Sequence, residues 1–146
     1  MRSPYLCAYH AERLKACESE AFRYWGEMMR RGVQAYVECR FDAAVLYLGT
    51  ALEIGLLRQR CQLNGLFEGL HIQKPVEFLV ELLKIDRQYH QVNELLDYVA
   101  RHSTAGTDTT LANFLNRSFI VLDNTAGARN STAQLPSASA VSSAVH

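Results

Sequence analysis

The stretch GVQAYVECRFDAAVLYLGTALEI, residues 32–54, decides the fold of this 146-residue chain. Its small and bulky apolar residues recur at intervals of three or four, which is the spacing of one face of an α-helix. A turn at Cys39-Arg40 interrupts the pattern so briefly that the two flanking helices must pack antiparallel as a hairpin. The second of these helices, expected over residues 41–62, is apolar on nearly every side, which predicts that it is the central helix of the protein.

The same spacing predicts helices on both sides of this hairpin. The first is expected to run from a Ser3-Pro4 start to about Glu38. Because that is long for a globular helix, two readings stay open, a continuous helix and one that breaks near Gly26. A glycine-containing connection with one helical turn around Leu66 should follow the central helix. The expected fold is all-α, a bundle of about five helices, the last three beginning at Lys74-Pro75, at Tyr89 and at a cap on Thr107 or Asp108.

The C-terminal residues differ in composition from the rest of the chain. From Asn124 onward they are mainly alanine, serine and threonine with one proline, Pro136, and almost no large apolar side chain. Such a segment cannot offset the conformational entropy that ordering would cost. We therefore expect a helical domain over residues 1–123 and a disordered tail over 124–146.

Composition and charge argue against several classes of function. Fifteen basic and fifteen acidic residues cancel, so the chain shows no overall electrostatic footprint of a nucleic-acid-binding or membrane-surface protein. Charged residues at Glu12 and Arg13 precede any apolar signal region, and no apolar run reaches the length of a membrane span. These observations predict a soluble, cytoplasmic protein. The four cysteines stand within helical apolar patterns, which predicts reduced cysteines packed in the core: Cys7, Cys17, Cys39 and Cys61.

The hairpin at 32–54 resembles one repeat of the tetratricopeptide family. Gly32 stands at the small position of the first helix of such a repeat, and Ala44 and Ala51 stand at the two small positions of the second. Phe41-Asp42 matches the turn between the helices. The resemblance implies a stack of helical hairpins and a protein-binding role.

The resemblance is incomplete. Four residues depart from the preferences of the family for tryptophan, leucine, phenylalanine and proline, namely Met28, Arg31, Leu48 and Leu56. A second hairpin fits loosely, with Tyr89, Val92, Leu96 and Val99 in the places of Phe41, Ala44, Leu48 and Ala51. Its insertion lengthens the period from the usual value of about 34 residues to 48. Because one repeat cannot bury both of its faces, the N-terminal segment and the last helix are expected to cover it.

Tetratricopeptide proteins bind peptides or helices in a groove lined by the first helix of each hairpin. The resemblance places this groove on an apolar set, Met29, Val33 and Tyr36, and on a charged set, Glu77, Glu81 and Lys84. An apolar groove with a charged rim would suit an amphipathic helix of a partner protein. Two alternatives stay open: the apolar set can pack beneath the chain's own N-terminal segment or last helix, or it can form a homodimer interface.

Candidates for chemistry are weak. Cys7 and His10 lie one helical turn apart, but Cys17 would lie about 10 Å further along a continuous helix, too far to join them around a metal ion. His71, His90 and His102 stand at or near predicted helix ends and accompany no nucleophile motif. The acidic pairs Glu18/Glu20 and Glu77/Glu81 are typical of solvated helix faces. We expect no cofactor and no metal.

The sequence therefore favours an adaptor that binds a peptide or helix of another protein and is not an enzyme. A small chaperone for a secretion or assembly client is the alternative, because tetratricopeptide-like folds also serve that role. A metal-dependent regulator or enzyme is the least favoured class. No nucleic acid or membrane partner is expected.

Overall fold

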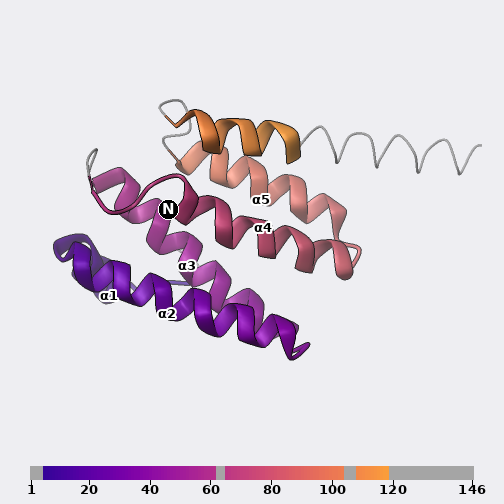
Figure 1. Ribbon diagram of the computed structural model, residues 1–146, viewed down its shortest axis with the longest axis horizontal. Helices are drawn as coiled ribbons and strands as arrows, with labels where there is room; N and C mark the ends of the chain where they lie inside the picture. Colours follow the sequence, from indigo (N-terminus) through magenta and orange to yellow (C-terminus); the bar gives the residue numbers. More distant parts are fainter. Residues whose placement is uncertain (1–4, 62–64, 104–107, 119–146) are drawn as a thin grey trace, which may run out of the picture.

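The computed structural model describes residues 5–61, 65–103 and 108–118, and within these ranges all of the regular secondary structure is α-helical (Figure 1). The all-α class predicted from the sequence is thus confirmed. The Ser3-Pro4 start and the tail from Asn124 lie outside the described residues. The helices are α1 (Ala8–Ala16), α2 (Glu18–Val37), α3 (Phe41–Cys61), α4 (Leu70–Ile85) and α5 (Tyr89–His102), followed by a sixth helical segment at 109–118.

Successive helices pack as antiparallel pairs in chain order. Helix α2 packs on α3, α3 on α4, and α4 on α5. Figure 1 shows α2 and α4 side by side in the nearer layer, with α3 between them in the layer behind. The first helices of the two hairpins therefore share one face of the bundle.

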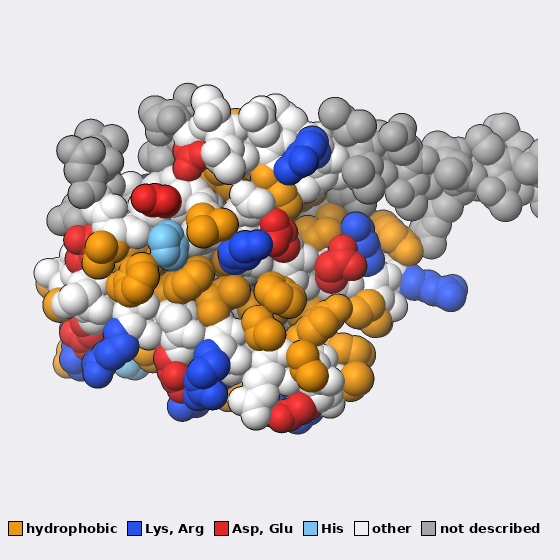
Figure 2. All heavy atoms as spheres, in the orientation of Figure 1, with side chains coloured by type: hydrophobic (Ala, Val, Ile, Leu, Met, Phe, Trp, Pro, Cys, Tyr) orange, Lys and Arg blue, Asp and Glu red, His pale blue; other side chains and the backbone are white. Residues whose placement is uncertain are grey.

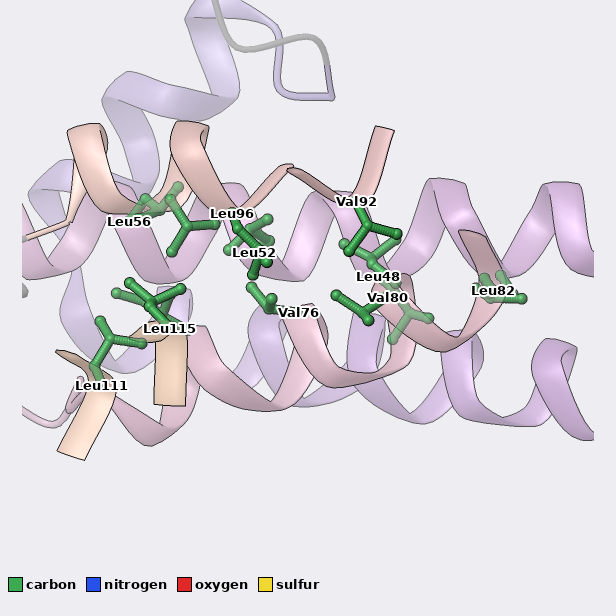
Figure 3. Close-up of a cluster of buried hydrophobic side chains, with 14 of the residues drawn as sticks. Leu48, Leu52, Leu56, Val76, Val80, Leu82, Val92, Leu96, Leu111 and Leu115 are labelled. Atoms are coloured by element: carbon green, nitrogen blue, oxygen red, sulfur yellow. The ribbon is translucent and has the colours of Figure 1, made fainter. Parts of the chain in front are cut away.

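Helix α3 is the centre of the structure, as its apolar sequence predicts. Every residue from Leu48 to Leu56 is buried. Figure 3 shows the principal core, in which leucines of α3 meet side chains of α4, α5 and the last helical segment. The labelled members of this core are Leu48, Leu52, Leu56, Val76, Val80, Leu82, Val92, Leu96, Leu111 and Leu115.

Two glycines allow neighbouring helices to approach α3 closely. A Cβ atom added to Gly32 of α2 would lie 2.7 Å from Cγ of Leu48, which is fully buried. A Cβ atom added to Gly55 of α3 would lie 2.9 Å from the carbonyl oxygen of His71 in α4. Both crossings leave no room for a side chain on the glycine.

The N-terminal helix breaks at Cys17 and is continuous through Gly26, where the sequence left a break open. Cys17 has an extended backbone, with φ −131° and ψ 106°, whereas Gly26 lies inside α2. The buried Arg58 of α3 donates hydrogen bonds to the carbonyl oxygens of Leu14 at 3.4 Å and Lys15 at 2.7 Å. A guanidinium group at these terminal carbonyls stabilises the end of α1, because it satisfies acceptors that have no intrahelical donor.

The connection after α3 also differs from expectation. Leu66 lies in a bend and not in a helical turn, and its backbone N–H donates to the carboxylate of Glu18. Helix α4 begins at Leu70, so Lys74-Pro75 lies inside the helix and does not open it. The start of the last segment matches one of the two predicted caps, since Oδ1 of Asp108 accepts hydrogen bonds at 3.0 Å from the amides of Thr110 and Leu111.

The cysteines are free, but their predicted place in the core was wrong. Cys7, Cys39 and Cys61 are exposed, and Cys17 is only partly buried. Each stands at or beside a helix end, where the side chain leaves the face that packs on the core. Cys39 in addition has φ 59°, the left-handed conformation that ends α2.

The close crossing at Gly32 gives a test with an internal control. Gly32→Ala should lower the free energy of unfolding by about 1–3 kcal/mol, because the new methyl group would overlap the fully buried Leu48 side chain. Gly26→Ala, in the same helix with no atom within 4 Å of the new Cβ, should raise it by about 0.5–1 kcal/mol. Denaturant titration of both variants measures the difference, and equal effects would contradict the close crossing.

Candidate functional site

A side chain of α2 hydrogen-bonds to the backbone of α4 where a proline interrupts the hydrogen bonding of that helix. Pro75 has no N–H to donate to the carbonyl oxygen of His71, its partner one turn earlier. Nε1 of Trp25, from α2, donates a hydrogen bond of 2.9 Å to this oxygen. The indole N–H of Trp25 thus replaces the backbone N–H that Pro75 lacks as the donor to the His71 carbonyl oxygen. This hydrogen bond explains how α4 can begin before Pro75.

Aromatic rings surround this hydrogen bond. The His71 ring lies 4.7 Å from the ring of Trp25, 5.4 Å from that of Phe22 and 5.3 Å from that of Phe67, measured between centroids. Burial lowers the pKa of His71, and its Nδ1 accepts a hydrogen bond from the backbone N–H of Glu68 at 3.0 Å. His71 is therefore a neutral packing residue at neutral pH.

The apolar set predicted for the groove lies on α2, beside α4. Met29 and Tyr36 are half-buried and pack against the principal core, and the Tyr36 ring contacts that of Phe78 on α4 at 5.6 Å. A second buried cluster joins α1, α2 and α3 through Leu14, Ala21, Met28, Ala51 and Ile54, with Phe67. Val33 is also half-buried but belongs neither to the principal core nor to this second cluster. Together with the charged set of α4, these residues form what we call the α2–α4 face.

The charged set lies along the other side of this face. Glu77, Glu81 and Lys84 follow one another at helical spacing on α4. Nζ of Lys84 lies 3.3 Å from Glu81, and Nζ of Lys74 lies 3.2 Å from Glu77. Because these partially exposed charges already pair within their own helix, they carry little net field and contribute little to stability.

Figure 2 shows the surface that results. Apolar side chains form a band across the middle of this side of the molecule, between α2 and α4, with charged groups on both sides of the band. On α2, Glu27 receives hydrogen bonds from Arg30 and Arg31, which lower the pKa of Glu27 to about 2. The surface thus combines an apolar band with charges of both signs that are already paired.

The residues considered for chemistry do not assemble into a centre. Sγ of Cys7 lies 3.0 Å from Nδ1 of His10 on the exposed start of α1. Within the described ranges, no three His, Cys, Asp or Glu side chains come close enough together to hold a metal ion. His90 is exposed, and the ring of His102 packs 4.4 Å from that of Tyr98. Among the described helices, none has the length and apolar character needed to span a bilayer.

Comparison with known proteins gives no family. No family model, no curated protein and no solved structure matches this chain. The α2–α4 face therefore has to be interpreted from its own residues.

The hydrogen bond between Trp25 and the His71 carbonyl can be tested with a double-mutant cycle. Trp25→Phe removes the indole N–H and keeps an aromatic ring. Its cost in unfolding free energy should be about 1 kcal/mol larger in the natural chain than in a Pro75→Ala background, where residue 75 can donate to the same carbonyl. Denaturant titration of the four proteins measures this coupling. An equal cost in both backgrounds would show that the proline does not create the need for the indole donor.

Proposed function

We propose that this chain is an adaptor whose α2–α4 face binds an amphipathic helix of another protein. The observation that carries the proposal is Val33, an apolar side chain that stays partly exposed and packs neither in the principal core nor in the second buried cluster. Met29 and Tyr36, one turn away on either side, are anchored to the core and hold this part of the face in place. A spaced row of apolar side chains is what the apolar stripe of a partner helix recognises.

The hairpin geometry supports assignment of residues 32–54 to a tetratricopeptide-type repeat. Ala44 and Ala51 are fully buried, and Gly32 lies against Leu48 where the two helices cross. The α4–α5 pair then serves as a degenerate second repeat. In such a stack, the first helices of the hairpins line the binding face, and here these are α2 and α4.

The charges of the face indicate the character of the partner. The α4 rim carries both signs, and the pairs Lys74–Glu77 and Lys84–Glu81 already neutralise one another. A partner of low net charge would thus bind mainly through apolar anchors. Its affinity should change little with ionic strength, because no large field is available to be screened.

A displayed library of amphipathic helices, with apolar anchors spaced at i, i+4 and i+7, tests the proposal while the natural partner is still unidentified. Helices selected on the natural chain should lose at least tenfold in affinity, about 1.4 kcal/mol, on Val33→Asp. The physical reason is that a carboxylate in the apolar band would have to be desolvated by the bound helix.

The matched control is Gln34→Asp. Gln34 lies about 100° further round α2 than Val33, so this variant adds the same charge to the same helix outside the apolar band. It should change the affinity less than twofold, with both variants shown to be folded by circular dichroism. Enrichment of sequences without apolar anchors, or equal loss on both variants, would refute the proposed face.

A further inference from the structure

A buried acid lies on another side of α3. Glu53 is 5% exposed, although it stands in the most apolar part of the chain. The hydroxyl of Tyr98 on α5 donates a hydrogen bond of 2.7 Å to its Oε1. Burial of a carboxylate is unfavourable unless hydrogen bonds or a cation compensate for the lost water. Among the described residues, the Tyr98 hydroxyl is the hydrogen-bond donor that the structure shows at this side chain.

A cavity of about 300 Å³ adjoins this carboxylate. It lies between α3, α4 and α5, and Tyr5 contributes to its lining. Half of the lining residues are leucine or valine, among them Leu52, Leu79 and Leu83. Glu94, which is exposed, lines the cavity as well and places a second carboxylate where it reaches solvent. The volume is at the lower end of the range for small-molecule sites.

The charge of the lining has one sign. Its ionisable groups are two carboxylates and two tyrosines, and none of the lining residues is Lys, Arg or His. The pKa of Tyr98 is raised by burial and by Glu53, and that of Tyr5 is raised for the same two reasons, so both hydroxyls are neutral at neutral pH. Arg60, two turns further along α3, partly offsets the raised pKa of Tyr98, but it is exposed and does not line the cavity. Its Nε donates to the carbonyl oxygen of Leu56 at 3.3 Å.

We propose that this cavity binds a primary alkylammonium group, with the cation at the Glu53 carboxylate and the alkyl chain against the leucine walls. A charge-assisted hydrogen bond to a desolvated carboxylate is stronger than one between neutral groups. The apolar walls favour the burial of the methylene groups, which are poorly solvated in water. The same group occurs on a free amine and on a lysine side chain. The site is separate from the α2–α4 face, so either proposal can fail alone.

The first experiment compares hexylammonium, hexanol and hexanoate as ligands of the full chain by isothermal titration calorimetry at neutral pH. These probes have alkyl chains of similar length and differ in charge. Hexylammonium should bind at least tenfold more tightly than hexanol, and hexanoate should not bind. Equal binding of the amine and the alcohol, or no binding of the amine at millimolar concentration, would overturn the proposal.

Two variants test whether the Glu53 carboxylate is the group that binds the cation. Glu53→Gln keeps the shape of the side chain and an acceptor for Tyr98, and it should abolish the preference for amine over alcohol. Asp97→Asn removes a charge from an exposed position of α5 and should leave the preference within twofold of the natural chain. An unchanged preference in Glu53→Gln would exclude this carboxylate as the cation site. The comparison of amine with alcohol uses the unaltered chain, so it decides the proposal even where Glu53→Gln does not fold.

A last arm identifies the source of the cation. Lysine blocked at both its amino and carboxyl ends presents the side-chain ammonium as a protein would. Tighter binding of blocked lysine than of hexylammonium would assign the cavity to a partner's lysine, and the reverse would assign it to a free amine. In both outcomes, Glu53→Gln should reduce the affinity for the ammonium probe. Binding of either probe that survives this substitution would count against the site.

Discussion

The burial of α3 along its middle, from Leu48 to Leu56, is the constraint on which the rest of the structure depends. A helix that is apolar on nearly all sides has to be covered on both flanks, and α2 and α4 provide this cover at the close approaches of Gly32 and Gly55. In front of α3, α2 and α4 also contact each other directly, through the hydrogen bond from the Trp25 indole to the His71 carbonyl oxygen and through the rings of Tyr36 and Phe78. The α2–α4 face is therefore a consequence of how α3 is covered, and its shape is held by core contacts.

The sequence alone was sufficient for the features that depend on local pattern. The hairpin of α2 and α3, the central place of α3, the start of α5 and, as one of two candidates, the Asp108 cap were predicted, because periodicity, turn length and capping chemistry act over a few residues. The groove residues on α2 and α4 do lie on adjacent helices of one face. Whether a partner binds there stays a prediction.

Two of the errors involve interactions between residues far apart in sequence. Arg58, more than 40 residues away, donates to carbonyl oxygens at the end of α1, and the indole of Trp25 donates to the His71 carbonyl oxygen in the first turn of α4. Neither is visible in a local pattern. In the sequence, Glu53 interrupts an apolar run. A single acidic residue surrounded by apolar residues in a central helix is a signal that could have predicted its burial.

The central claim is that the α2–α4 face is available to another protein, and the oligomeric state in solution tests it most directly. Light scattering coupled to size exclusion should give the mass of a single chain, 16.5 kDa, for the natural protein and for Val33→Asp alike. A dimer of the natural chain that Val33→Asp converts to a monomer would show that a second copy occupies the face, and would contradict the proposed role as an adaptor.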